Sequence, residues 1–255
     1  MGAPMLAALQ RAGHQATGFD IRAGLGTDIG TDATIFRRKI GTLLSVVRDA
    51  DETDALLFDD QRMIDAPELT TIIVCSTLSP RYTRALRARV PDHIALIDAP
   101  LSGAQVRAQA GTLSFMLGGD PGDIATQMPL FEAMGAAIHI MGDFGAGMTA
   151  KVLNNLLAAS HTAMTRMVLD WADAQGLDES RLLALIETSS GQNWLASGFE
   201  SIEFARDGHA SDNSIGILVK DVAAALDIAP EGASTTLPRA VQEAIRALKP
   251  RPRRA

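Results

Sequence analysis

The chain has 255 residues, a formal net charge of −7 at pH 7 and 47% hydrophobic residues. This composition excludes a largely disordered protein. The acidic balance and the aromatic content of 4% disfavour a duplex-binding face or a base-stacking platform, so no nucleic-acid partner is expected. No apolar run approaches the ~18 residues that a membrane-spanning helix needs, and the first residues lack the basic start of a secretory signal. Cys75 is the only cysteine, which favours a reducing, cytoplasmic location.

The first 142 residues alternate short apolar runs with amphipathic stretches, which is typical of an α/β domain. The pattern predicts helices over residues 3–12, 51–58, 80–90 and 121–134. It predicts strands over residues 15–20, 42–47, 71–75, 94–98, 113–117 and 137–140. Residues 24–34 are rich in glycine, threonine and aspartate, and we expect a loop there.

From residue 143 to the end the pattern is helical. A long helix is predicted over residues 146–175, and shorter ones over 179–188, 194–206, 214–228 and 235–248. We therefore expect two domains, a sheet domain over residues 1–142 and an all-helical domain over residues 143–255, joined by the long helix. Small residues along that helix permit close packing of helices, and we expect a homodimer or homotetramer.

Three further features are interpreted as structural. The basic cluster from Lys249 to Arg254 is interleaved with prolines and is expected to be a solvated tail. Trp171 and Trp194 are expected to be packing residues. None of the five histidines stands at metal-ligand spacing from a cysteine or carboxylate, so no metal site is expected.

The N-terminal segment carries two residues suited to a dinucleotide. Gly2 begins the first predicted helix, where backbone N–H groups and the helix dipole favour a phosphate. Asp20 ends the next predicted strand, and an acidic residue about 20 residues on suits a ribose hydroxyl pair. Ordinary turn chemistry explains both residues equally well, so this segment alone leaves the two interpretations open.

A second segment, DAPLSGA, follows an apolar strand. Ser102 and Gly103 are expected at the carboxyl edge of the sheet, where open α/β sheets bind their ligands. The serine hydroxyl and the N–H groups of the small residues that follow it can hold a carboxylate. A tight turn that requires small residues is the alternative interpretation.

The third segment begins the long helix. Lys151 and Asn155 are four residues apart and project from one face. A lysine on an apolar face of small residues is partly desolvated, which suits proton transfer. Asn155 can hydrogen-bond a substrate hydroxyl or carboxylate. The alternative is a solvated lysine beside a neutral asparagine.

In this order, the segments resemble the β-hydroxyacid dehydrogenase family, the relatives of 3-hydroxyisobutyrate dehydrogenase within the 6-phosphogluconate-dehydrogenase-like group. Residues 1–5 match the end of the family pattern G-L-G-x-M-G-x-P-M. Residues 98–113 match D-A-P-x-S-G-G…G-T-L, with Ala104 in place of the last glycine of S-G-G. Residues 145–155 match G-x-G-x-x-x-K-x-x-N-N, and residues 76–80 and 220–221 match two supporting motifs. The resemblance covers nearly the whole chain.

The resemblance implies a Rossmann-type doubly wound sheet plus an all-α C-terminal domain. It implies hydride transfer between a nicotinamide and a small 3-hydroxy acid or its semialdehyde, with Lys151 as the catalytic acid/base. It places the substrate carboxylate on Ser102, Gly103 and Ala104, with Asn155 as a further anchor. The residues that it implies for the cofactor are Gly2, Asp20, Arg22, Val47, Arg48, Thr77, Lys220 and Asp221, the last orienting the neighbouring helix.

NAD is the expected cofactor, because a carboxylate at Asp20 repels a 2′-phosphate. Arg22 softens this preference and leaves NADP open. The chain begins inside the glycine fingerprint, so the first strand of the family's sheet and two leading glycines are missing from it. We therefore expect weak or absent nicotinamide binding, which titration of NADH against this chain and a version extended upstream tests.

Two alternative functions remain open at this point. One is an NADPH-dependent imine reductase, although relatives with that activity usually carry aspartate or tyrosine where Lys151 stands. The other is a catalytically silent binding or scaffolding homologue. The residues that line the pocket for the substrate's side chain are expected within 192–199 and 212–217.

Overall fold

The computed structural model describes residues 1–253, and for Ala104 the backbone alone. The chain forms two compact units, Met1–Lys151 and Val152–Ala255. The helix α7 (Ala146–Ala174) runs through the division between them. The domain boundary expected after residue 142 lies just before this helix and stays a prediction.

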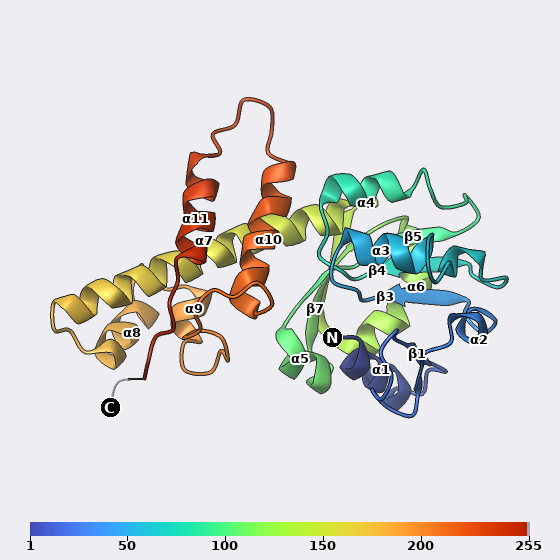
Figure 1. The fold of residues 1–255 in the computed structure, drawn as a ribbon, viewed down its shortest axis with the longest axis horizontal. Helices are drawn as coiled ribbons and strands as arrows, with labels where there is room; N and C mark the ends of the chain where they lie inside the picture. The colour runs from blue at the N-terminus through green and yellow to red at the C-terminus, as the bar shows by residue number, and fades with distance from the viewer. Residues whose placement is uncertain (254–255) are drawn as a thin grey trace. The chain divides into compact units, whose positions relative to one another are not determined.

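The first unit is built on a six-stranded sheet in the order β3-β4-β5-β7-β6, in which β8 also pairs with β7 (Figure 1). Its strands are β3 (Thr42–Ser45), β4 (Thr71–Val74), β5 (Ala95–Asp98), β6 (Leu101–Ser102), β7 (Leu113–Gly118) and β8 (Gly135–Gly142). The pairs β3–β4, β4–β5 and β7–β8 are parallel, whereas β7 is antiparallel to β5 and β6. The strands β1 (Gly18–Phe19) and β2 (Ile29–Gly30) form a separate parallel pair. The predicted α/β class is confirmed, and the antiparallel β7 is an addition to it.

Helices cover both faces of this sheet, with one hydrophobic core on each face. The helices are α1 (Gly2–Arg11), α2 (Ala33–Arg37), α3 (Ala50–Leu57), α4 (Pro80–Leu86), α5 (Ala104–Ala110) and α6 (Pro121–Met134), with a 3-10 turn at Met63–Asp65. Alternate residues of β4 face different cores, because successive side chains of a strand point to opposite faces. Ile72 and Val74 pack with α3 and α4, and Ile73 packs with α1 and α6.

The regular elements of the second unit, among its described residues, are all helices. After α7 it contains α8 (Glu179–Glu187), α9 (Trp194–Ser197), α10 (Ser214–Asp227) and α11 (Thr236–Arg246). Small side chains on α7, Ala159 and Ala163, pack against Val222 of α10 and Ile245 of α11. Among the described residues, none of the helices combines the length and apolar character needed to cross a bilayer.

Some predicted elements differ from the structure. The helix predicted over residues 194–206 ends at Ser197, where Gly198 follows and a β-carbon would approach Ile202 to 2.7 Å. Residues 24–34 contain the short strand β2 and the start of α2 instead of only a loop. The prediction that Trp171 packs inside the protein is wrong, because its side chain is 65% exposed.

The C-terminal segment requires a larger correction. Arg251 is only 7% exposed, so the expected solvated tail is wrong at this residue. Its Nε donates a hydrogen bond to Glu179 Oε2 at 2.6 Å, and its Nη1 pairs with Asp170 at 2.7 Å and with Asp173 at 2.8 Å. A buried guanidinium needs such partners, and carboxylates of α7 and α8 supply them.

Candidate active site

The ends of two strands and the first turn of α7 meet around Asp98. This residue ends β5 and is fully buried. Its Oδ1 accepts a hydrogen bond from the N–H of Gly145 at 2.6 Å, and its Oδ2 accepts one from the N–H of Met148. The N–H of Leu78, which follows β4, donates to Met148 Sδ at 3.2 Å. The turn that contains Thr77 therefore lies against the same helix start.

Glycines make this close approach possible. A β-carbon at Gly147 would lie 2.2 Å from the carbonyl oxygen of Met116 on β7. A β-carbon at Gly118, the last residue of β7, would lie 2.3 Å from Asp98 Oδ1. The first turn of α7 consequently packs directly on the backbone of β7, and any larger residue at these two positions displaces it.

The carboxyl group of Asp98 has an unusual protonation equilibrium. Burial raises the pKa of Asp98 to about 6, although the N–H groups of Gly145 and Met148 and the charge of Arg84 act in the opposite direction. Arg84 lies on α4, and its Nη2 donates to Thr149 Oγ1 at 2.8 Å. Two separate elements of the first unit, β5 and α4, thus contact the start of α7.

The predicted proton-transfer residue follows this anchored turn directly. Lys151 comes three residues after Met148, and its side chain is buried, with 7% exposure. A solvated lysine, the alternative interpretation of this position, is therefore excluded. The observed burial matches the partly desolvated lysine that proton transfer requires.

The predicted carboxylate-binding turn begins four residues after Asp98. Ser102 ends β6 and pairs with Ser114 of β7. Gly103 has a φ of +135°, and a β-carbon there would lie 2.7 Å from the Arg107 side chain, so this position requires glycine. Ala104 is the first residue of α5, and its side chain lies outside the described part of the structure.

The predicted ribose-binding residue is already paired. Asp20 follows β1, and its Oδ1 accepts hydrogen bonds from the backbone N–H of Arg22 at 2.9 Å and from Arg22 Nε at 3.1 Å. Its Oδ2 accepts one from Arg22 Nη2 at 3.1 Å. These bonds with Arg22 lower the pKa of Asp20. The carboxylate is ionised at neutral pH, and the guanidinium beside it offsets its charge.

A second charged pair lies close to the first. Arg48 follows β3, and its Nε donates to Glu52 Oε1 at 2.6 Å. Arg48, and more weakly the charge of Arg22, lowers the pKa of Glu52, which indicates that the two pairs are neighbours. Gly2, the first residue of α1, lies beside Val46, because a β-carbon on Gly2 would be 3.8 Å from Val46 Cβ.

This edge of the first unit fits a dinucleotide. It combines the N-terminus of a ten-residue helix, which suits a phosphate, with an ionised carboxylate that can accept ribose hydroxyls. Met1 provides no side-chain cap for α1, so its first N–H groups are not taken up by a capping side chain. The predicted residues Asp20, Arg22 and Arg48 belong to two charged pairs that interact electrostatically, and Gly2 lies beside Val46, which Val47 and Arg48 follow in the chain.

The remaining predicted residues belong to the second unit. Asn155 is buried on α7, and its Nδ2 donates to Oδ2 of Asp221 at 2.6 Å. Asp221 is buried on α10, and Lys220 Nζ lies 4.0 Å from its Oδ1. The carboxylate therefore sets the orientation of the Asn155 amide.

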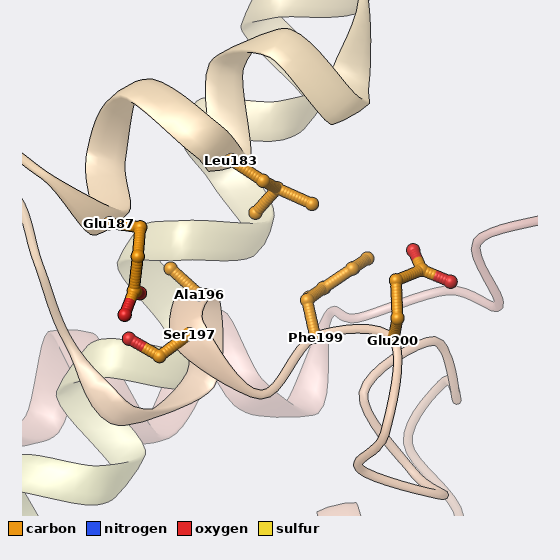
Figure 2. Close-up of a pocket in the computed structure, with 6 residues that line it drawn as sticks. All are labelled: Leu183, Glu187, Ala196, Ser197, Phe199 and Glu200. Carbon is orange, nitrogen blue, oxygen red and sulfur yellow. The ribbon is translucent and has the colours of Figure 1, made fainter.

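A surface hollow of the second unit lies between α8 and the segment that includes α9. Figure 2 shows Leu183 and Glu187 on one side of it and residues 196–200 on the other. Its lining includes Ala196, Ser197 and Phe199, which lie in one of the two segments expected to line the side-chain pocket. The hollow contains none of the predicted catalytic, carboxylate-binding or cofactor residues.

Two family models together match almost the whole chain. The model described as the NAD binding domain of 6-phosphogluconate dehydrogenase matches residues 1–142. The model described as the NAD-binding domain of NADP-dependent 3-hydroxyisobutyrate dehydrogenase matches residues 145–253. The chain belongs to the β-hydroxyacid dehydrogenase family.

Several members of this family are similar over most of their length. The NAD-dependent L-serine dehydrogenase of Pseudomonas aeruginosa is 32% identical over 92% of this chain and 84% of its own. The 3-hydroxyisobutyrate dehydrogenase of the same organism is 33% identical over 89% of this chain and 81% of its own. The structure of Mycobacterium tuberculosis 3-hydroxyisobutyrate dehydrogenase with L-serine has a TM-score of 0.79 at 26% identity, covering 95% of this chain and 88% of that one.

These findings confirm the expected class of activity. The chain is an NAD(P)-dependent hydroxyacid dehydrogenase, and NAD is the expected cofactor. Imine reductases are distant structural neighbours at 15% and 16% identity, and this likeness shows the fold alone. The imine reductase alternative therefore has no support beyond the shared architecture.

Sequence reasoning missed one residue at the centre of this site. From the sequence, Asp98 is placed at a strand end and at the start of the D-A-P motif and is given no role, although an acidic residue that closes an apolar strand needs partners when it is buried. This need for partners is the feature of the sequence that could have pointed to a role for Asp98. The identity of the partners, Gly145 and Met148, could not be deduced, because they lie 47 and 50 residues further along the chain.

Proposed function

We propose that the chain transfers hydride between NAD and a small 3-hydroxy acid or its semialdehyde, with Lys151 as the acid and base. The observation that supports this most directly is the buried Lys151, one turn after a helix start that is tied to the sheet. The nicotinamide, when bound, accepts or supplies the hydride. Lys151 takes the hydroxyl proton during oxidation and returns a proton to the alkoxide oxygen during reduction.

The substrate's carboxylate is proposed to bind Ser102, Gly103 and Ala104. The serine hydroxyl and backbone N–H groups at this turn can donate to an anion, and the positive φ of Gly103 shapes the turn. Asn155 is a further anchor, and its hydrogen bond to Asp221 supports this role because it holds the amide in one orientation.

For the cofactor we propose that Gly2 contacts the phosphates and Asp20 the adenosine ribose. The residues proposed to line the rest of the dinucleotide are Val47, Arg48, Thr77 and Lys220. The proposed role of Asp221 is to orient α10 and the side-chain amide of Asn155. The bidentate pairing of Arg22 with Asp20 supports acceptance of NADP as well, since it offsets the charge that repels a 2′-phosphate.

The domain roles follow the extents of the two family models. Residues 1–142 are proposed to bind the dinucleotide, and residues 143–255 to provide the interdomain helix and the substrate and oligomerisation domain. A cytoplasmic location without a nucleic-acid partner is supported by the net charge of −7 and by the buried free thiol of Cys75.

A homodimer or homotetramer is proposed on the basis of an apolar stripe on α7. Large apolar side chains recur there at helical spacing and are exposed, namely Leu153, Leu157, Met164 and Trp171. A contiguous exposed apolar face is typical of a protein interface. We expect Leu157→Asp to lower the oligomeric mass measured by light scattering. Leu237→Asp, at an exposed leucine on α11, is the control, and an unchanged mass for Leu157→Asp contradicts the proposal.

The decisive experiment for the catalytic role is Lys151→Ala. We expect kcat for a panel of small hydroxy acids with NAD to fall by ~10²–10⁴-fold, the usual contribution of a positioned acid or base. NADH affinity, measured by fluorescence titration, should stay the same. Lys39→Ala, at an exposed lysine, is the control. Unchanged turnover in Lys151→Ala refutes the role of this lysine, and an unmodified chain that binds NADH but turns over no hydroxy acid supports a silent homologue.

A further inference from the structure

We propose that Asp98 is a positioning residue for the reaction, because its buried carboxylate holds the backbone of the α7 turn that carries Lys151. This inference rests on the proposed role of Lys151 in proton transfer. It concerns a residue that is not among the proposed substrate-binding or cofactor-binding residues, and it acts through the backbone of the helix.

The hydrogen bonds of Asp98 differ from an ordinary helix cap. The first N–H groups of a helix lack intrahelical partners and are usually satisfied by the residue just before the helix. In α6, Asp120 does this locally, accepting from the N–H of Gly122 at 2.8 Å. In α7 the acceptor comes instead from β5, so the start of the helix is tied to the sheet.

Both carboxylate oxygens act as hydrogen-bond acceptors, which the ionised form supplies. Oδ1 accepts from Gly145 and Oδ2 from Met148, so an asparagine, which has one acceptor oxygen, would turn an NH₂ group toward one of the two N–H donors. The carboxylate also has no room to shift. Gly118 and Gly147 approach it so closely that added β-carbons would lie 2.3 Å and 3.0 Å from its oxygens.

The charged groups around Asp98 have distinct roles. Arg84 of α4 acts on the carboxylate through its charge and bonds to Thr149, in the next turn of α7. Lys151 lies one turn beyond Met148 on the same helix. A shift of the anchored turn therefore moves the lysine. A displacement of about 1 Å can reduce a catalysed rate by ~10²-fold.

A double-mutant cycle tests whether Asp98 acts through Lys151. Asp98→Asn should lower kcat by ~10²-fold and leave the affinity for NADH unchanged. In a Lys151→Ala background the same substitution should lower the residual rate by less than about threefold, because interacting positions are not additive. An equal loss in both backgrounds shows a merely structural role and overturns the proposal, as does an unchanged kcat in Asp98→Asn.

The cycle separates this inference from the proposed function. If Lys151→Ala alone leaves turnover unchanged, the proposed function fails whatever Asp98 does. Asp120→Asn is the matched control, because it makes the same substitution at a local helix cap, where one side-chain oxygen accepts both bonds. Asparagine caps a helix as well as aspartate does, so we expect turnover to stay unchanged; a loss of turnover as large as that in Asp98→Asn overturns the specific role of Asp98.

Hydrogen exchange on the unmodified chain keeps the proposal testable where Asp98→Asn does not fold. The N–H groups of Gly145 and Met148 should exchange at least ~10²-fold more slowly than unbonded helix-start amides. Thr236 and Leu237 supply that reference, because α11 begins without a side-chain cap bond. Exchange at Gly145 and Met148 as fast as at this reference overturns the proposal without any variant.

Discussion

The two units of the chain place their charged side chains in opposite ways. At the edge of the first unit, the pairs Asp20–Arg22 and Arg48–Glu52 join exposed arginines to half-buried carboxylates. Its buried carboxylate, Asp98, bonds to backbone N–H groups instead of to a cation. In the second unit the buried guanidinium groups of Arg166 and Arg251 bond to carboxylates and to backbone carbonyls.

Arg166 illustrates the second arrangement. It is almost fully buried on α7 and donates to the carbonyl oxygens of Ala205 at 2.9 Å and Asp207 at 2.8 Å. Together with Arg251 it fastens the C-terminal segment to the helices. Exposed pairs contribute little to stability, whereas breaking a buried pair is costly. The comparison indicates that the charged pairs at this edge of the first unit contribute little to stability, whereas the buried charges of the second hold the fold.

The largest expected effect is therefore in the second unit. Arg251→Ala should lower the free energy of unfolding by ~3–5 kcal/mol, because it removes the buried cation that pairs with Asp173 and one of the two that pair with Glu179. Urea unfolding measures this change. Arg253→Ala alters an exposed arginine two residues further on and should change stability by less than about 0.5 kcal/mol. Equal effects of the two substitutions would show that the buried network is not stabilising.

The next effect concerns the buried carboxylate of the first unit. Burial raises the pKa of Asp98 to about 6 from its ordinary value of 3.8, so between these pH values the folded chain binds a proton that the unfolded chain does not. The contribution of Asp98 to the free energy of unfolding therefore rises as pH falls from 6 to 4, by up to ~3 kcal/mol.

Comparison with Asp98→Asn isolates this contribution from other titrating groups. As the pH falls from 7 to 4, the free energy of unfolding of the unmodified chain should rise relative to that of this variant. Chemical unfolding at a series of pH values measures it. A difference that is constant across this range contradicts the buried, raised-pKa state of Asp98.

The smallest effect concerns the exposed pair at the proposed ribose site. Arg22→Ala removes the cation that offsets Asp20, so the carboxylate should repel a 2′-phosphate more strongly. We expect the ratio of KM for NADP to KM for NAD to rise by roughly tenfold, equivalent to ~1.4 kcal/mol, while stability changes by less than ~1 kcal/mol. Arg38→Ala, at another exposed arginine, should leave the ratio unchanged. A falling ratio in Arg22→Ala would show that Arg22 does not favour NADP by this route.

Elements with strong local signals were predicted well from the sequence. The helix predicted over residues 121–134 has the same bounds as α6, because Asp120 caps it locally and Pro121 suits its first turn. The long helix α7 ends one residue earlier than predicted. The helix predicted over residues 194–206 failed because Gly198 and the turns after it end the helix, although apolar residues continue.

The sequence by itself determined the α/β class, the helical second part and the placement of Lys151 and Asn155 on one helix face, since periodicity and capping depend on residues a few positions apart. Only the tertiary structure decided that Asp98 anchors α7 and that Arg251 is buried. Their bonds join residues between 47 and 81 positions apart. A buried charge signals that partners are needed, but the packing of the strands and helices selects which residues those partners are.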